Sequence, residues 1–583
     1  MLHTLTRSLR ENKGPALVTV LLSALEAVFE IVIPLFMSNL IDFGIEGGSM
    51  AAVWKFGAFL LLLAAFQLST GVLAARIAAR ASVGFAANLR EDMYNNVQTF
   101  AFSNIDKFST ASIVTRLTTD TTNVQNAFQM LMRMAIRAPV MLIFSMIVSF
   151  RISRDISMTF LIILPILALA LFFIIRSVFP AFSRVFRTYD ELNNVVQENV
   201  RGIRVVKSFN QERHEIGKFG AISERIYKDF SKGERLITLN APLMQFCIYT
   251  CMIVISWLGA KAIIASGNDP ALGLTTGNLT ALITYTMQIL SSLMMLSMVF
   301  AMLTISLSSA RRIAEVLEER SDIPQPEQPV MTVRNGAVDF DHVSFVYASK
   351  ADKKVLDDID LHIRSGETIG IIGGTGASKS SLVQLIPRLY DVTGGKLTLG
   401  GVDVRDYDLD TLRGAVAMVL QKNELFSGTI AENLRWGNEN ATDEQLRHAC
   451  ELACADGFIS AMPDGYDTHI EQGGTNVSGG QKQRLCIARA LLKKPKVLIL
   501  DDSTSAVDTR TDAQIQQALS TYIPDTTKII IAQRISSVQN ADRIVVLDDG
   551  HIDAVGSHDE LLRTCEIYRE VYESQQKGGE DDA

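Results

Sequence analysis

Apolar residues are concentrated in the first half of the 583-residue chain. Before residue 310, several stretches of about 18 or more mostly apolar positions are long enough to cross the hydrocarbon core of a bilayer as helices. We expect six spans, at roughly 16–42, 53–76, 134–151, 157–179, 241–265 and 277–307. The rest of the sequence holds no comparable run. The pattern therefore predicts an α-helical membrane domain followed by a soluble domain.

The segments that connect the spans alternate in length. Those near 43–52, 152–156 and 266–276 are short, whereas 77–133 and 180–240 are long, polar and patterned as helices. Both long segments and the N-terminus are rich in Lys and Arg, which favours the cytoplasmic side of a membrane. The long segments are therefore expected to extend the spans into the cytoplasm.

Composition narrows the class of protein only a little further. Hydrophobic residues make up 48% of the chain and the mean hydropathy is +0.20, as expected when part of a chain lies in a membrane. The net charge is −8 and no basic run indicates a nucleic-acid partner. Cys450 and Cys454 lie one helical turn apart, but no His or second Cys pair completes a metal site. The six cysteines are therefore interpreted as reduced packing residues.

Two glutamates inside the first span are candidates for function. Glu26 and Glu30 are one turn apart and share a face of the expected helix. Charged groups within a membrane are costly, and so they point to function by default. Three roles are open: binding a cationic substrate, carrying protons, or pairing with Arg or Lys beside a water-filled cavity.

The sixth span carries a stripe of methionines with a glutamine beside it. Flexible, polarizable thioethers suit promiscuous binding, although a stripe at helical spacing is also typical of plain packing. The stripe comprises Met287, Met294, Met298 and Met302, with Gln288 alongside. The candidate substrate residues are therefore Glu26, Glu30, Met287, Gln288, Met294 and Met298.

The soluble half carries a phosphate-binding motif. A buried strand expected over 366–372 is followed directly by Gly373-Gly374-Thr375-Gly376-Ala377-Ser378-Lys379-Ser380-Ser381. This matches G-x-x-x-x-G-K-[ST], except that Ser378 stands in place of the second Gly. Backbone N–H groups of such a loop hold phosphates, while Lys379 reaches the outer phosphates and the Ser380 hydroxyl binds Mg²⁺. Ser378 keeps its N–H but adds a Cβ where Gly permits unusual backbone angles.

Further motifs surround this loop in a fixed order. They are Tyr347, Val419-Leu420-Gln421-Lys422, Val477-Ser478-Gly479-Gly480-Gln481, Val497-Leu498-Ile499-Leu500-Asp501-Asp502, Ser505-Ala506-Val507-Asp508 and Ile530-Ile531-Ala532-Gln533-Arg534. With them, the soluble half resembles the ATPase domain of ABC transporters, and almost the whole chain resembles an ABC exporter. The resemblance implies an α/β P-loop domain that uses ATP and Mg²⁺.

The resemblance also implies a role for each motif. Tyr347 corresponds to the residue that stacks on adenine. The implied metal ligands are Ser380, Gln421 and, through water, Asp501, and the nucleotide-binding set is Tyr347, Gly373 to Ser381, Gln421 and Asp501. In this family two ATPase domains meet head to tail, so one chain's signature and D-loop complete the other chain's ATP site. The residues with that role are Ser478, Gly479, Gly480, Gln481 and Asp508.

Two departures from the family pattern affect the expected chemistry. Asp502 stands where the family has the Glu that polarises the attacking water. One methylene fewer withdraws the carboxylate by roughly 1.5 Å, the length of a C–C bond, and a misplacement near 1 Å can cost about a hundredfold in rate. Gln533 stands where the family has the switch His, and an amide cannot exchange a proton near neutral pH. The chain's own site is therefore expected to bind ATP and hydrolyse it poorly.

Two cytoplasmic turns resemble the coupling helices with which ABC exporters contact their ATPase domains. In the second long segment, the helical pattern over 198–209 is broken at Gly202. The first long segment has a similar candidate at 104–112. The alternative is a pair of solvated helical hairpins.

These observations predict four parts of the chain. They are a membrane domain over 1–315, a Pro-stiffened linker over 316–335, an ABC nucleotide-binding domain over 336–575 and a disordered tail over 576–583. The expected location is the bacterial inner membrane, with the N-terminus and the ATPase domain in the cytoplasm.

The expected function is export of amphipathic small molecules, of the multidrug type, by one half of a heterodimeric ABC exporter. The implied partners are a second, different half-transporter, membrane lipid and the amphipathic substrate, without nucleic acid. The alternatives are a homodimer with a slower carboxylate base, a dedicated lipid or peptide exporter, and a regulatory membrane subunit that binds ATP.

Overall fold

The computed structural model describes residues 1–270, 273–347, 354–503 and 506–580. The chain forms two compact units. The first comprises Met1–Gln98 and Thr110–Glu319, and the second comprises Thr99–Ser109 and the residues from Arg320 onward. The short segment Thr99–Ser109 thus belongs to the second unit, although residues of the first, membrane unit flank it in sequence.

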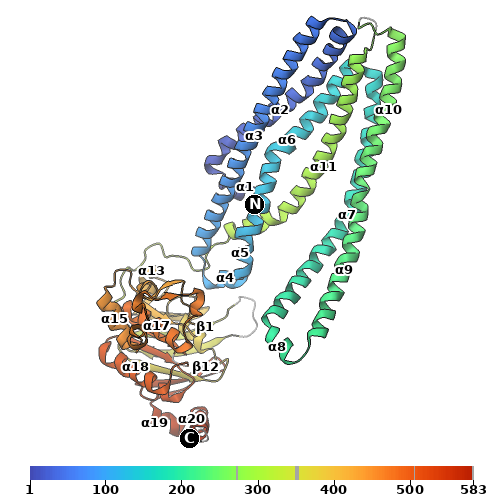
Figure 1. Ribbon diagram of the computed structural model, residues 1–583. Coiled ribbons are helices and arrows are strands. Elements are labelled where there is room, and N and C mark those ends of the chain that lie inside the picture. Colours follow the sequence, from blue (N-terminus) through green and yellow to red (C-terminus); the bar gives the residue numbers. More distant parts are fainter. Residues whose placement is uncertain (271–272, 348–353, 504–505, 581–583) are drawn as a thin grey trace. The chain divides into compact units, whose positions relative to one another are not determined.

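In the described part of the membrane unit, every regular element is a helix (Figure 1). Its elements are α1 (Leu2–Arg7), η1 (Arg10–Asn12), α2 (Lys13–Asn39), η2 (Leu40–Glu46), α3 (Met50–Gln98), α5 (Thr110–Thr115), η3 (Arg116–Asp120), α6 (Thr121–Ile152), α7 (Arg154–Arg201), α8 (Ile203–Ser208), α9 (Glu212–Thr238), α10 (Asn240–Ser266) and α11 (Thr276–Glu318). Six helical stretches among the described residues are long and apolar enough to span a membrane, as expected. A helix forms its backbone hydrogen bonds internally, which suits it to the apolar interior of a membrane.

The long connecting segments continue the helices well beyond an apolar length. Helix α7 ends at Arg201, and the short α8 follows directly after Gly202, where the sequence pattern predicts a break. Helices α2, α3, α6 and α11 pack together. Helices α7 and α9 form a hairpin, and the short α8 lies at the turn between them (Figure 1). A core of α7, α10 and α11 side chains, which includes Phe160, Ile255 and Leu282, joins this hairpin to the rest of the unit.

The second unit is an α/β domain. Its strands are β1 (Val338–Phe345), β2 (Leu356–Ile363), β3 (Thr368–Gly373), β4 (Gly394–Leu399), β5 (Val402–Asp403), β6 (Val416–Val419), β7 (Gly428–Thr429), β8 (His469–Ile470), β9 (Val497–Asp501), β10 (Thr527–Ile531), β11 (Arg543–Asp548) and β12 (His551–Gly556). Its helices are α4 (Phe102–Phe108), α12 (Lys379–Gln384), α13 (Leu409–Ala415), α14 (Ile430–Arg435), α15 (Asp443–Leu452), α16 (Asp456–Ser460), η4 (Gly465–Asp467), η5 (Gln472–Gly474), α17 (Gly479–Leu492), α18 (Thr509–Tyr522), η6 (Ile535–Ser537), α19 (His558–Thr564) and α20 (Glu566–Glu580).

The central sheet has the strand order β12-β11-β3-β10-β9-β6. All of its pairs are parallel except β11 with β12. Strands β9 and β10 are buried along their whole length, as is usual for central strands of a parallel sheet, and apolar residues fill β9 before Asp501 and the last three positions of β10. A second, antiparallel sheet has the order β2-β1-β4-β5.

Two element ends differ from the expected domain boundaries. Helix α11 continues to Glu318, past the boundary expected at 315. Helix α20 continues to Glu580, where the sequence pattern predicts a disordered tail from 576. Residues 581–583 of that expected tail lie outside the described residues.

Candidate functional site

The candidate nucleotide site lies at one edge of the central sheet. Strands β3, β10, β9 and β6 are neighbours in that order and run parallel, so their carboxyl ends lie at the same edge. The P-loop follows β3, Gln533 follows β10, Asp501 ends β9 and Gln421 follows β6. Ligands of open α/β sheets bind beyond the carboxyl ends of the strands. Motifs that are separated along the chain thus converge on one location.

The P-loop has the backbone that its pattern requires. Ser378 adopts a left-handed conformation with φ 67° and ψ 22°, at the position where the motif has Gly. For an L-residue other than Gly, this conformation costs roughly 1–2 kcal/mol. The Lys379 ammonium donates to the carbonyl oxygens of Gly373 and Gly374, at 2.8 Å each. Burial lowers the pKa of Lys379, while Asp501 and Asp502 oppose that shift.

A hydroxyl and a carboxylate form a pair suited to Mg²⁺. The Ser380 Oγ donates to Asp501 Oδ1 at 3.1 Å. Burial raises the pKa of Asp501 and the neighbouring Asp502 adds to this, whereas Ser380 and Lys379 lower it. No cluster of three or more His, Cys, Asp or Glu side chains suited to a metal occurs among the described residues. Mg²⁺ bound to phosphates needs only one or two carboxylates and keeps several waters, so the residues present fit this ion.

Asp502 is held by two side-chain amides. The Gln533 Nε2 donates to Asp502 Oδ2 at 2.7 Å, and the Gln421 Nε2 is 3.5 Å from the same oxygen. Asp502 is itself buried and has a positive φ of 48°. The structure thus brings together Asp502 and Gln533, the two departures that affect the expected chemistry. Gln421 lies beside Asp502 in this arrangement, next to the Ser380–Asp501 pair.

Tyr347 connects the antiparallel sheet to the P-loop helix. Its hydroxyl is 2.8 Å from Ser381 Oγ, and its ring is half exposed. It packs edge-to-face against Tyr390, with ring centroids 5.1 Å apart. An exposed aromatic face beside a phosphate-binding loop is suited to stacking on a base.

The first of the two turns expected to act as coupling helices contacts this aromatic group. The Tyr390 hydroxyl donates to Asp106 Oδ2 at 2.9 Å, and the Phe102 ring stacks on Tyr390 at 6.0 Å. Burial raises the pKa of Tyr390, and Asp106 adds to the shift. Helix α4, which overlaps the turn expected at 104–112, therefore contacts the Tyr390 ring that also packs on Tyr347.

The signature residues begin helix α17. Ser478 is its N-cap: its hydroxyl accepts from the Gln481 N–H at 3.3 Å, and its own N–H donates to Gln481 Oε1 at 2.9 Å. This reciprocal capping box satisfies two otherwise unpaired donors. A Cβ at Gly480 would lie 2.8 Å from the Ala506 carbonyl oxygen, so Gly480 permits close packing on the D-loop.

The rest of the D-loop is tied down by side chains. The Ala506 N–H donates to Gln483 Oε1 at 3.0 Å. Asp508 is exposed and caps α18, accepting from the Thr511 N–H at 2.9 Å, and the backbone and side-chain hydrogen bonds with Thr511 lower its pKa. Ser505, also expected in this motif, lies outside the described residues.

In the membrane unit, the two candidate glutamates share one arginine. The Arg137 Nη1 of α6 donates to Glu26 Oε1 at 3.0 Å, and its Nη2 donates to Glu30 Oε2 at 2.5 Å. Of the three roles that the sequence leaves open, pairing with Arg is the one seen in this geometry.

The candidates on the sixth span divide into two groups. The side chains of Met287, Met294 and Met298 are exposed within this chain. Gln288, by contrast, is used internally: its Nε2 donates to the Glu30 carbonyl at 3.1 Å, and its Oε1 accepts from Ser145 Oγ at 3.1 Å. Gln288 therefore ties α11 to α2 and α6.

Sequence reasoning missed several residues of these sites. Gln575 of α20 donates to the Gln533 carbonyl at 2.8 Å and accepts from the Ile535 N–H at 2.9 Å, and it bears no motif. Tyr390 likewise has no motif of its own. Arg133 and Arg137 do have a signal in the sequence. Arginines at the start of an apolar span are costly there, so they indicate a charged partner.

A P-loop ATPase unit in the same chain as six apolar helices defines a membrane transport ATPase. The family model described as ABC transporter transmembrane region matches residues 16–294, and the one described as ABC transporter matches residues 356–505. The chain belongs to the ABC transporter family.

Curated relatives are similar over almost the whole chain. The chain is 35% identical to the uncharacterized ABC transporter ATP-binding protein YfiB of Bacillus subtilis, with 96% of each chain covered. It is 33% identical to the uncharacterized ABC transporter ATP-binding protein Rv1273c of Mycobacterium tuberculosis, over 99% of this chain and 98% of that protein. A solved bacterial Atm1-family ABC exporter with ATP bound has the same fold, with a TM-score of 0.79, 24% identity and coverage of 97% and 98% of the two chains.

Proposed function

We propose that this chain is one half of a heterodimeric ABC exporter of the bacterial inner membrane, which moves amphipathic small molecules of the multidrug type outward. In this proposal the N-terminus and the ATPase unit lie in the cytoplasm. The observation that carries the proposal is the contrast between the amide-bound Asp502 and the intact signature at Ser478–Gln481.

The proposed role of the chain's own site is to bind ATP with Mg²⁺ and to hydrolyse it poorly. Lys379 would hold the outer phosphates, Tyr347 the adenine, and Ser380 and Asp501 the metal, whose chemistry when bound is to neutralise phosphate charge. Asp502 has the shorter side chain, and its amide neighbours Gln533 and Gln421 cannot take a proton at neutral pH. Proton transfer from the attacking water is therefore poorly supported in this site.

The signature side is proposed to serve the partner. Its capped helix N-terminus and close Gly480–Ala506 packing provide an ordered anion-binding end for a second chain's nucleotide. One functional and one slow site then act together. ATP retained in the slow site biases the equilibrium between conformations, because it binds the closed state better than the open state.

Exposed apolar residues on and next to α8 support a partner chain. Val205 and Phe209 are 60% and 71% exposed, although apolar side chains at a helix end gain by burial. The ATPase unit has a surface pocket of about 350 Å³ beside Gln421, whose lining includes Leu420, Phe426 and Trp436. In the proposed dimer, α8 of one chain docks in this pocket of the other.

The first experiment is the native mass of a tagged complex extracted gently from the membranes of its own host. The expected result is a one-to-one complex with a different polypeptide that carries Glu and His at the positions of Asp502 and Gln533. A mass of twice this chain would contradict the heterodimer and make Asp502 a working, slower base.

A second experiment tests transport itself. Inverted vesicles that contain the complex are expected to accumulate a fluorescent amphiphile in the presence of ATP, and the amphiphile is expected to stimulate ATP hydrolysis. ATP binding with neither accumulation nor stimulation would favour a regulatory subunit. Uptake of labelled phospholipid or peptide alone would favour a dedicated exporter.

A further inference from the structure

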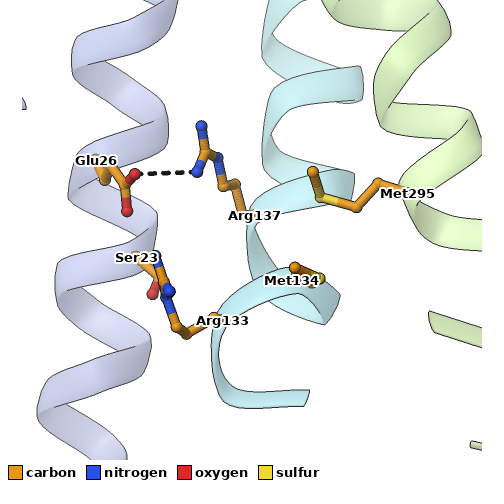
Figure 2. Close-up of a pocket in the computed structure, with 6 residues that line it drawn as sticks. All are labelled: Ser23, Glu26, Arg133, Met134, Arg137 and Met295. Atoms are coloured by element: carbon orange, nitrogen blue, oxygen red, sulfur yellow. Dashed lines mark hydrogen bonds and ion pairs between the residues drawn. The ribbon is translucent and has the colours of Figure 1, made fainter. Parts of the chain in front are cut away.

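A small cavity, lined by both charged and apolar residues, lies inside the membrane unit between α2, α6 and α11 (Figure 2). We call it the Ser23 pocket. Its volume is about 60 Å³, which is room for roughly four water-sized groups at 10–15 Å³ each. It is lined by Ser23 and Glu26 of α2, Arg133, Met134 and Arg137 of α6, and Met295 of α11.

Three polar atoms of this pocket are buried without a hydrogen-bond partner among the described residues. They are Ser23 Oγ, the Oε2 of Glu26 and the Nε of Arg133. Ser23 is 1% exposed and Glu26 is 8% exposed. A buried, unsatisfied polar group costs about 1–3 kcal/mol, so three around one cavity indicate that a ligand or water completes them.

The charges around the pocket cancel. Arg137 bonds one oxygen of each of the two carboxylates, Glu26 and Glu30, and Arg133 is a second guanidinium group in the lining. Figure 2 shows Glu26 reaching from α2 toward Arg137 on α6. A cationic head group entering here would meet two guanidinium groups as well as the carboxylate, so the pocket does not favour a cation.

The unsatisfied atoms specify what does fit. Arg133 Nε needs an acceptor, Glu26 Oε2 needs a donor, and the Ser23 hydroxyl can act as either. An alcohol both donates and accepts with one oxygen and carries no charge. The thioether side chains of Met134 and Met295 line the same cavity and suit the apolar part of a ligand.

Helix α3 leaves room for this arrangement. An added Cβ at Gly71 would lie 3.1 Å from Glu26 Oε1, the oxygen that bonds Arg137. Gly71 therefore lets the carboxylate stay in the position that directs its second oxygen to the pocket.

We propose that the Ser23 pocket binds the uncharged, hydroxyl-bearing head of an amphipathic compound, held by Ser23, Glu26 and Arg133. This inference rests on the proposed export function and names the class of substrate head group. It replaces the cationic substrate considered for Glu26 from the sequence.

The test uses the full-length complex in lipid nanodiscs. Three alkyl diazirine probes of one chain length end in a hydroxyl, a carboxylate or a trimethylammonium group, and mass spectrometry locates the photolabelled residues. We expect the alcohol probe to label the segments around Met134 and Met295 several-fold more than the other two probes. Ser23→Ala is expected to lower this labelling about fivefold, the effect of losing one hydrogen bond near 1 kcal/mol.

Matched variants control for damage to the fold. Ser149→Ala removes the hydroxyl of a buried serine on α6 that donates to the Ser145 carbonyl of its own helix. This variant should leave labelling unchanged. Arg133→Met keeps an unbranched side chain and should reduce labelling as Ser23→Ala does. Preferential labelling by the ammonium probe, or equal labelling that neither variant changes, would overturn the proposal.

Transport assays separate this inference from the proposed function. Head-group-selective labelling without ATP-driven uptake would overturn export and leave the pocket as a binding site. ATP-driven uptake of all three probes with no labelling preference at Met134 or Met295 would overturn the pocket and leave export.

Discussion

The signature side and the P-loop side of the ATPase unit are built differently. The signature side begins a helix with a reciprocal capping box and places small residues where the D-loop packs closely. The P-loop side contains two non-glycine residues with positive φ, Ser378 and Asp502, and a carboxylate held by two amides. Side chains in such backbone positions cost about 1–2 kcal/mol each. The comparison teaches that the departures at Ser378, Asp502 and Gln533 all lie on the side that the chain would use for its own ATP.

The largest expected effect comes from breaking the signature side. Gly480→Ala adds a Cβ 2.8 Å from the Ala506 oxygen, so the helix start and the D-loop must separate. We expect ATP hydrolysis by the complex to fall by up to about a hundredfold, the cost of a misplacement near 1 Å. Steady-state hydrolysis of the purified complex measures it.

Gly457→Ala is the matched control, because a Cβ there meets nothing within 4 Å. Equal losses in both variants would contradict a specific role for Gly480. An unchanged rate in Gly480→Ala would mean that hydrolysis does not depend on this chain's signature.

Repairing the P-loop side should make the two sides more alike. Asp502→Glu with Gln533→His restores the longer carboxylate and a group that titrates near neutral pH. We expect turnover at this chain's own site to rise about tenfold, a modest share of what general-base catalysis can contribute. The measurement is hydrolysis in a complex whose other site is inactivated.

Asp502→Glu and Gln533→His, measured separately, show how the gain in turnover divides between the two positions. No gain in the double variant would refute the account of Asp502 and Gln533. Adding Ser378→Gly would then show whether the P-loop is the dominant defect.

The buried Asp501 predicts a dependence on pH. Burial raises its pKa, so the folded state binds the proton more tightly than the unfolded state does. Its favourable contribution to stability is therefore present below the unfolded pKa and is lost as the pH rises through the raised folded value. Asp501→Asn should raise the stability of the nucleotide-free ATPase unit by about 1 kcal/mol at neutral pH, and less at acidic pH.

Thermal unfolding of the complex at neutral and acidic pH, with and without MgATP, tests this expectation. The variant should lose most of the stabilisation by MgATP. A variant that is equally stable at both pH values and still stabilised by MgATP would contradict the assigned role of Asp501.

A smaller effect is expected from Ser378→Gly. Removing the Cβ relieves the left-handed strain at φ 67°. Because glycine also gains freedom in the unfolded chain, we expect a net gain below about 1 kcal/mol in stability, and ATP affinity rising by a few-fold at most. Nucleotide titration and thermal unfolding measure the two effects, and weaker ATP binding would contradict the strain account.

The smallest expected effect concerns Gln575. Its amide bonds the chain on both sides of Arg534, at Gln533 and Ile535. Gln575→Ala should change turnover by about twofold, since each exposed hydrogen bond contributes on the order of 1 kcal/mol or less. Gln576→Ala, which truncates the exposed glutamine one position further along α20, is the control. A larger loss of turnover in Gln576→Ala than in Gln575→Ala would indicate general damage to α20.

The sequence alone determined the features that depend on local spacing. Apolar length predicts the six membrane helices, the Gly202 break separates α7 from α8, and the P-loop pattern marks Ser378 as a position needing an unusual backbone. These follow because helix length, glycine freedom and motif spacing act over a few residues.

Only the tertiary structure decided which distant side chains meet. Arg137 bridges Glu26 and Glu30 from more than a hundred residues away, and Gln421 and Gln533 converge on Asp502 from two different strands. Helix α4 belongs to the ATPase unit although membrane helices flank it in sequence. Such contacts arise from strand order and helix packing, which bring together residues that no local pattern links.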